Sequence, residues 1–373
     1  MEFAWTEEQN DVRELARRIL SEKVDDAAQK AREKEQQSWL PAAWEALADA
    51  ELLSLVVSEK NGGAGMGAQE LGILLREAGR VAAPIPLLGT LVLGAIPLDR
   101  FGTPAQAKLG VQALGKKPLV AGAWFEAATS TLAQPKASLR REGGALRLNA
   151  IKTNVEAADA AEAFVVNAQL EGEPAVVIVR KSATGVSLAE QLGTNIVPLA
   201  QLRCEDVEIA EEDVVATGAR AKEMIAFAEN WALFAQSALM LGLADGAVAL
   251  IADFAPKRVQ FGQPIAQFQA VGQRSADAWI NLQAIELLVL KAAFAIDHGE
   301  NDAAAVRKAK YWASEGGHHI VAAASHIHGG MGFDRDYPLH RFFLTLKLHE
   351  FTLGGANAQL QAIGQAIAQG AKA

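Results

Sequence analysis

Apolar residues recur at three- and four-residue intervals along two long stretches in the C-terminal third of the chain. The first stretch runs from residue 224 to 254 and the second from 270 to 296, and this spacing places apolar side chains on one face of a helix. Between them, Gly262 and Pro264 cannot continue a helix. The pattern therefore predicts two antiparallel helices of about seven turns each, joined by a tight connection as in a helix bundle.

The rest of the chain divides into a second helical block and a β-rich block. Residues 6 to 115 have helical spacing, and Thr6 stands before two acidic residues as a helix N-cap. From residue 119 to 209, short apolar runs are punctuated by Gly, Pro and Asn, which is typical of a small antiparallel barrel. Helices, strands and helices in separate blocks indicate separate domains rather than alternating β-α units.

These blocks predict an α+β multidomain protein. Its expected parts are an N-terminal α-helical domain (1–117), a central antiparallel β-barrel (118–218) and a C-terminal four-helix bundle (219–373). The last part is interrupted by Gly329-Gly330 and Gly354-Gly355, where the chain must turn.

Composition narrows the classes of function. The chain has 373 residues and a formal net charge of −9, which argues against a nucleic acid or an anionic membrane as partner. The single cysteine, Cys204, excludes an intrachain disulfide and a multi-thiolate metal site, and no carboxylate joins the histidines at metal-ligand spacing. The start is unlike a signal peptide, and apolar windows such as 84–97 are too short and broken to span a bilayer. We expect a cytoplasmic protein without a metal ion.

Two motifs lie in order about 60 residues apart in the C-terminal part. Residues 258–269 read R-V-Q-F-G-Q-P-I-A-Q-F-Q, and residues 328–333 read H-G-G-M-G-F, followed by Y-P-L-H-R at 337–341. An arginine beside the free N–H groups of a Gly-rich loop suits a diphosphate, because both donate to anionic oxygens. The pair resembles the acyl-CoA dehydrogenases, flavoproteins that desaturate acyl-CoA thioesters between the α and β carbons.

The resemblance covers essentially the whole chain and implies FAD as cofactor, an acyl-CoA as substrate and an electron-transfer flavoprotein as acceptor. In such an enzyme a carboxylate removes the α-proton while a hydride leaves the β-carbon for the flavin. The carboxylate must therefore lie within hydrogen-bond reach of that proton and have a tuned pKa.

Neither of the base positions implied by the resemblance carries a carboxylate. The family's Tyr-Glu-Gly-Thr stretch corresponds to Thr-Leu-Gly-Gly at 352–355, so the base position is Leu353. Some members place the glutamate on the helix before the R-x-x-F-G loop, which corresponds to Ala232. The catalytic residue is thus unknown, and the nearby Glu229 and Glu350 are candidates. Each of them is either a shifted base or an ordinary ion-pair residue.

The strand that contacts flavin in the family is altered as well. Where the family has Asn-Gly-x-Lys-x-Trp-Ile-Thr, residues 149–156 read N-A-I-K-T-N-V-E, so that Asn154 replaces the indole and Glu156 the hydroxyl near the flavin. A carboxylate facing a flavin that must accept negative charge is unfavourable unless it turns away. Gly355 and Asn357 stand where Thr and Gln contact flavin in the family.

In the resembled family each active site is shared across a subunit interface, and this chain keeps mainly the part that is given to the neighbour. The cofactor-binding residues that the resemblance implies are Arg258, Gln260, Phe261, Phe268, Gln269, His326, Gly329, Gly330, Gly355 and Asn357.

This pattern suggests one subunit of an α2β2 acyl-CoA dehydrogenase that acts on a bulky acyl-CoA, such as a steroid side chain, with the base on the other subunit. Two alternatives stay open. One is a homo-oligomer with a displaced base at Glu229, Glu350 or Glu156, and the other is a non-catalytic subunit that binds FAD or acyl-CoA. A homo- or hetero-tetramer is expected in any case.

Overall fold

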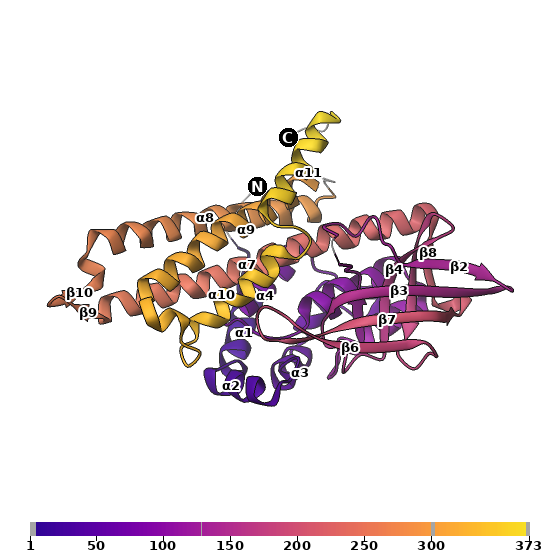
Figure 1. The fold of residues 1–373 in the computed structure, drawn as a ribbon, viewed down its shortest axis with the longest axis horizontal. Helices are drawn as coiled ribbons and strands as arrows, with labels where there is room; N and C mark the ends of the chain where they lie inside the picture. Colours follow the sequence, from indigo (N-terminus) through magenta and orange to yellow (C-terminus); the bar gives the residue numbers. More distant parts are fainter. Residues whose placement is uncertain (1–4, 128, 300–302, 371–373) are drawn as a thin grey trace. The chain divides into compact units, whose positions relative to one another are not determined.

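The computed structural model describes residues 5–127, 129–299 and 303–370. Helices come first along the chain, then strands, then helices again, as the sequence predicts (Figure 1). The N-terminal block contains α1 (Glu7–Lys23), α2 (Asp26–Glu35), α3 (Pro41–Asp49), α4 (Ala68–Arg80), the π-helical η3 (Leu87–Ala95), α5 (Ile96–Phe101) and α6 (Pro104–Gln112). The predicted N-cap is confirmed, because the Thr6 hydroxyl accepts from the Gln9 N–H and the Gln9 side chain accepts from the Thr6 N–H.

The central block is one mixed sheet. Its strands are β1 (Val120–Ala123), β2 (Ser138–Glu142), β3 (Ala145–Val155), β4 (Ala163–Leu170), β5 (Glu173–Arg180), β6 (Val186–Leu192), β7 (Pro198–Ile209) and β8 (Val214–Thr217). The order is β6-β7-β3-β2-β4-β5-β8, and β1 also pairs with β4.

Two pairings in this sheet, β1 with β4 and β2 with β4, are parallel, so the expectation of a purely antiparallel sheet was wrong. Within the described residues the path ends at β6 and β8, and a closed barrel is not confirmed. Strand-like runs in a sequence reveal where strands are. They do not reveal the direction of a partner that long connections bring alongside.

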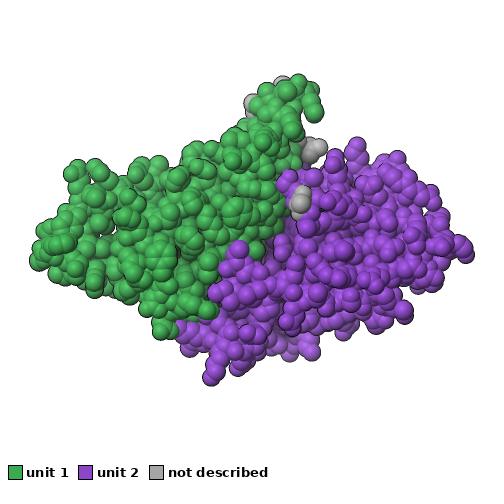
Figure 2. All heavy atoms as spheres, in the orientation of Figure 1, with its two compact units in different colours: residues 1–26, 68–83, 233–373 green, residues 27–67, 84–232 purple. Residues whose placement is uncertain are grey.

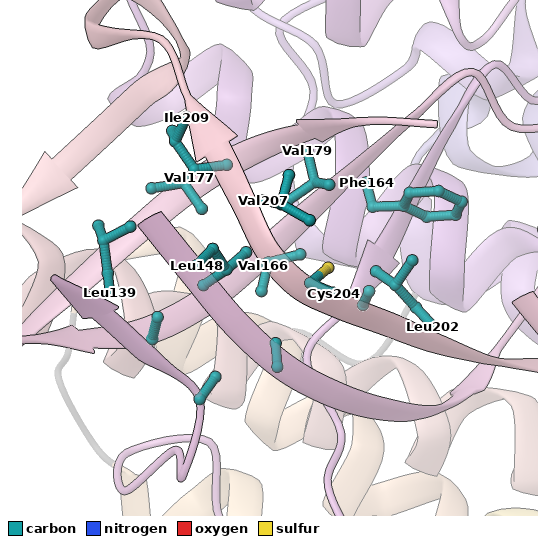
Figure 3. Close-up of a cluster of buried hydrophobic side chains, with 14 of the residues drawn as sticks. Leu139, Leu148, Phe164, Val166, Val177, Val179, Leu202, Cys204, Val207 and Ile209 are labelled. Atoms are coloured by element: carbon teal, nitrogen blue, oxygen red, sulfur yellow. The ribbon is translucent and has the colours of Figure 1, made fainter. Parts of the chain in front are cut away.

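The sheet has its own apolar core. Alternate residues Leu146, Leu148 and Ala150 of β3 are buried, as the two-residue period of a strand requires. Figure 3 shows part of this cluster, in which side chains of β2, β3, β4, β5 and β7 point toward one another, among them Leu139, Leu148, Val166, Val177 and Ile209. This packing holds the end of β3 in place, and Glu156 follows directly after it.

The C-terminal block contains α7 (Gly218–Lys257), the hairpin β9 (Val259–Gln260) and β10 (Gln263–Pro264), α8 (Gln269–Asp297), α9 (Ala303–His328), η6 (Gly329–Phe333), α10 (Leu339–Phe351) and α11 (Ala356–Ala368). The two long helices and their tight connection are confirmed as α7, the hairpin and α8. The helix α9 packs against α8, α10 and α11. The described part of this block has five helices, so the four-helix bundle is not confirmed; α11 is separate because the chain turns at Gly354, whose φ is +85°.

Contacts group the chain into two compact units (Figure 2). Unit 1 contains residues 1–26, 68–83 and 233–373, and unit 2 contains residues 27–67 and 84–232. The N-terminal helices are therefore divided between the units, and one boundary falls inside α7. The three domain ranges expected from the sequence remain a prediction.

Two helices, α7 and α8, are long and apolar enough to cross a membrane by length and composition alone. In α7, 61% of the most apolar window is buried, as in the core helix of a folded domain, whereas in α8 the share is 33%. Trp279, Ile280 and Leu287 of α8 are each more than half exposed. The apolar surface of α8 is thus open to a partner.

Candidate functional site

The segment 258–269 forms an exposed hairpin at the end of α7. Gln260 pairs with Gln263, and the Ile265 N–H donates to the Arg258 carbonyl at 2.8 Å. The turn has φ of +54° at Phe261 and +80° at Gly262, the pair of left-handed residues that a type I′ turn needs. A non-glycine residue in this conformation is strained, and Phe261 is 94% exposed. The combination points to a function for Phe261 outside the chain's own core.

Aromatic contacts bring the second motif beside the first. The ring of His328, the last residue of α9, stacks on Phe254 with centroids 4.3 Å apart. Phe254 belongs to the last turn of α7, and Arg258 follows directly after that helix. His328 Nε2 lies 3.0 Å from the Tyr337 hydroxyl, and its Nδ1 lies 2.8 Å from the Ala324 carbonyl. Burial lowers the pKa of His328, which favours the neutral ring. The Gly329-Gly330 turn is thereby held near the start of the hairpin.

Most of the predicted cofactor residues in these two segments face solvent. Phe268 is half-buried and meets Phe261 edge-on at 6.2 Å. The Arg258 guanidinium has no hydrogen bond or ion pair with another described residue. The exposed members are Arg258, Gln260, Phe261, Gln269, His326, Gly329 and Gly330. Such a set can donate to the oxygens of a diphosphate.

The first expected base position is an aliphatic side chain in the core of unit 1. Leu353 is 4% exposed, lies between α10 and α11, and has φ of +59°. Its carbonyl accepts from the Gln359 side chain at 2.8 Å. Lys310 is fully buried, donates to the carbonyls of His349 and Glu350 at the end of α10, and has its pKa lowered to about 7 by burial. Lys310 was not singled out from the sequence, because nothing in its neighbourhood along the chain marks it as buried.

This same segment continues into α11, where two more predicted cofactor residues lie. Gly355 is half-buried at the helix N-cap, and Asn357 is exposed. No hydrogen bond is recorded from the side chain of Asn357 to another described residue. Their role toward the cofactor stays a prediction.

The candidate carboxylates Glu229 and Glu350 both have partners. Glu229 is buried, and its Oε2 accepts from the Thr131 hydroxyl at 2.6 Å and the Leu132 N–H at 2.7 Å. Glu350 accepts from Lys347 Nζ at 2.7 Å and lies 3.9 Å from His318 Nδ1. Glu229 thus holds the loop that contains Thr131, and Glu350 forms an ion pair with Lys347. Catalytic roles for the two residues remain untested predictions.

Ala232, the second expected base position, is fully buried on the part of α7 that belongs to unit 2. Its methyl group cannot act as a general base. Glu229 lies one turn earlier on the same helix and is directed to the loop that contains Thr131. A shifted base at Glu229 would therefore have to leave two hydrogen bonds.

A buried ion pair organises the loop between β1 and β2. Lys152 Nζ lies 2.6 Å from Glu126 Oε1 and 2.8 Å from Asn167 Oδ1, and Lys152 is fully buried. Glu126 also accepts from the backbone N–H groups of Lys136 and Ala137. Burial lowers the pKa of Lys152 to about 8. Lys152 and Glu126 thus both have hydrogen-bond partners, and the network ties the loop to β3 and β4. The sequence alone did not reveal this network.

Glu156 turns inward at the end of β3. Its Oε2 accepts from the Gly89 N–H of η3 at 2.8 Å, and withdrawal from water raises its pKa to about 7. Asn154 and Ala157 on either side have φ of +55° and +47°. The carboxyl group has thus turned away from the outer face of the strand, where Asn154 is exposed.

Metal chemistry is not suggested by the part of the chain that the structure describes. There, no three or more His, Cys, Asp or Glu side chains lie together as a ligand set for a metal ion.

Comparisons with known proteins match this arrangement from end to end. The models of the acyl-CoA dehydrogenase N-terminal and C-terminal domains match residues 6–114 and 230–368. Acyl-CoA dehydrogenase FadE27 of Mycobacterium tuberculosis is 30% identical over 381 residues, covering 99% of each chain.

Two solved structures are similarly close. A variant of the Tcur3481-Tcur3483 steroid ACAD is 33% identical, with 98% of each chain covered and a TM-score of 0.91. The ChsE4-ChsE5 complex of Mycobacterium tuberculosis is 31% identical, with 100% of each chain covered and a TM-score of 0.91. The chain therefore belongs to the acyl-CoA dehydrogenase family, and it is an FAD-dependent oxidoreductase with that family's order of helical, sheet and helical domains.

Proposed function

We propose that this chain is one subunit of an α2β2 acyl-CoA dehydrogenase in which FAD lies between unlike subunits and the other subunit supplies the catalytic base. The observation that carries the proposal is Leu353, a buried leucine where the resembled family has its glutamate. The names of both similar structures join two components, Tcur3481 with Tcur3483 and ChsE4 with ChsE5, which supports a heteromer.

The residues of this chain fit one half of an FAD site. The exposed Arg258, the projecting Phe261 and the exposed glycine turn at Gly329 suit the diphosphate and its neighbourhood. When bound, FAD supplies a two-electron acceptor for the hydride that leaves the β-carbon. These side chains act by binding and by excluding water, and none of them moves a proton.

The chain's own sheet fits the flavin ring poorly. Asn154 offers no aromatic surface, and Glu156 places an ionisable carboxyl beside η3. Because this carboxyl group has turned away and is bound to the Gly89 N–H, it does not take the place of the hydroxyl that the resembled family has near the flavin. We therefore infer that this chain contributes its hairpin to a cofactor held mainly by the other subunit.

The proposed substrate is an acyl-CoA thioester with a bulky acyl group, such as a steroid side chain. The steroid ACAD among the similar structures supports this class. We further propose an electron-transfer flavoprotein as the acceptor, because the family resemblance implies one, and we propose a cytoplasmic location.

The first test is to express the chain alone and together with a paralogue that retains the Tyr-Glu-Gly-Thr stretch, and to quantify flavin per chain after denaturation. We expect a colourless protein alone and a yellow complex that a bulky acyl-CoA bleaches. About one FAD per chain in the protein expressed alone would contradict the shared site.

The alternatives predict different results for conservative substitutions. In a self-sufficient homo-oligomer, Glu229→Gln, Glu350→Gln or Glu156→Gln would lower kcat by about 10²–10⁴-fold, because the base would be lost. In the proposed complex each of the three leaves kcat within about threefold, since the base is on the other subunit. A complex that binds FAD and acyl-CoA but never bleaches would favour the non-catalytic alternative.

A further inference from the structure

An open cavity of about 400 Å³ lies in unit 1, among α1, α4, α7 and α8, and shares no residue with the predicted cofactor or base positions. Its walls contain four arginines. The lining residues are Trp5, Asn10, Arg13, Arg17, Arg76, Arg80, Asp245, Glu286 and Leu290. These four guanidinium groups form a cluster of positive charge, and none of them is a predicted cofactor or base residue.

Three of the arginines are neutralised by neighbouring carboxylates. Arg17 makes a bidentate pair with the buried Glu77 at 2.7 and 3.0 Å. Arg76 donates to Glu286 at 2.7 Å and to Asp245 at 3.3 Å. Arg80 lies 3.5 Å from Glu77 and 3.8 Å from Asp245. Three carboxylates thus face four guanidinium groups.

Arg13 holds the remaining positive charge. Its guanidinium carbon lies 4.6 Å from the centre of the Trp5 ring, which fixes the group by stacking. No described carboxylate forms an ion pair with it, and its Nε is buried without a hydrogen-bond acceptor among the protein atoms that the structure describes. A planar, oriented guanidinium with free donors matches the two oxygens of a carboxylate.

A narrow apolar annex of about 30 Å³ shares Trp5, Arg76, Glu286 and Leu290 with the cavity. Its other walls are mainly aliphatic or aromatic and include Ile73, Phe234, Leu241 and Val289. This space accepts only a few carbon atoms. A ligand that fills both parts therefore has one negative charge and a short apolar chain.

We propose that this cavity binds a short-chain aliphatic carboxylate, whose oxygens accept hydrogen bonds from Arg13 and whose chain enters the annex beside Trp5. The single charge of such a ligand balances the one guanidinium of the cavity that no described carboxylate pairs with, whereas the second charge of a dianion would be repelled by Asp245 and Glu286. The inference is independent of the α2β2 proposal, because every residue it uses belongs to unit 1 of this chain.

The test is a titration of the full chain, in the oligomeric form in which it purifies, with sodium butyrate, followed by ligand-observed saturation-transfer NMR. We expect a Kd of roughly 1 mM, in keeping with a ligand of so few atoms. Arg13→Gln should weaken binding by about 10-fold or more, because the charge-assisted hydrogen bonds are lost. Arg13→Lys, which keeps the charge without the fork, should lie between the two.

The matched control is Arg18→Gln, which removes an exposed arginine of the same helix that does not line the cavity. It should change the Kd by less than about twofold. Butyrate binding that persists unchanged in Arg13→Gln, or 1-butanol binding as tightly as butyrate, would overturn the proposal. If Arg13→Gln does not fold, as judged by circular dichroism, the comparison of Arg13→Lys with wild type decides the question.

Discussion

At the scale of single residues, the positions that depart from the family pattern are accommodated by specific contacts. Leu353 is packed in a left-handed turn whose carbonyl is bound by Gln359. Glu156 turns toward η3 and accepts from the Gly89 N–H. These are stable local solutions, and reverting one residue alone would leave the others unadapted to a base or a flavin. The packing around these two positions therefore fits the proposal that this chain has no catalytic base of its own.

The raised pKa of Glu156 makes a prediction about stability and pH. Its pKa of about 7 in the folded state lies above the ordinary value of 4.5, so the folded protein binds a proton more tightly than the unfolded chain. The stabilisation that this carries is complete below about pH 4.5 and is lost as pH rises through 7. Glu156→Gln keeps an acceptor for Gly89 without the charge. We expect it to be more stable than wild type at pH 8 by about 2 kcal/mol, a figure discounted because the side chain keeps some contact with solvent.

Urea unfolding of wild type and Glu156→Gln at pH 5 and pH 8 measures this difference. The control Glu190→Gln alters a glutamate of β6 that is exposed, and it should show no such dependence. A gap between wild type and Glu156→Gln that is equal at both pH values would contradict the assignment.

At the scale of elements, the hairpin β9–β10 is the clearest sign of a shared site. The hairpin has few contacts with the rest of the chain: Phe261 and Val259 are 94% and 54% exposed, and the backbone of Phe261 is strained. By contrast, η6 and α9 are tied to α7 through His328 and Phe254. Aromatic stacking thus anchors the base of the hairpin, while its tip is exposed.

The hairpin should therefore matter for flavin retention and not for folding. In the co-expressed complex, we expect Arg258→Gln to raise the dissociation constant of FAD by about 10–100-fold, because a charge-assisted contact to phosphate is lost. The midpoint of thermal unfolding of the chain alone should stay within about 1 °C, since the side chain is exposed.

Leu192→Ala is a suitable control, because it shortens an exposed side chain at the end of β6, away from the hairpin. It should leave FAD binding unchanged. If Arg258→Gln retained flavin as well as Leu192→Ala does, the hairpin would not be the diphosphate contact.

At the scale of the whole molecule, the apolar surface of α8 implies a partner. Ile280 and Trp279 are 64% and 54% exposed on a helix whose apolar window is only one-third buried. Exposed apolar surface of this extent marks a site of association. We expect this face to be covered in the proposed tetramer.

Ile280→Asp tests that expectation, because burying an unpaired carboxylate in an interface costs several kcal/mol. Native mass spectrometry of the complex should show smaller species in place of the tetramer. Ser187→Asp introduces the same charge at an exposed position of β6 and should leave the mass unchanged. An intact tetramer with Ile280→Asp would place the interface elsewhere.

The sequence by itself determined the order of helical and β-rich blocks, the N-cap at Thr6, the paired long helices and the family. These features follow from local periodicity, from turn residues such as Gly262 and Pro264, and from motifs that are continuous along the chain. The missing carboxylate at Leu353 could also be read directly from the sequence, because it needs only a residue type at a motif position.

Only the tertiary structure decided the parallel strand pairs, the inward turn of Glu156, the contacts that occupy Glu229 and the approach of Glu350 to His318. Each depends on groups that are distant along the chain, as Thr131 is from Glu229 or Glu126 from Lys152. The spacing of apolar residues indicates which face of a helix or strand is buried. It does not indicate which side chains of another helix or strand will contact that face. Burial and hydrogen bonding between such groups arise only when the chain has packed.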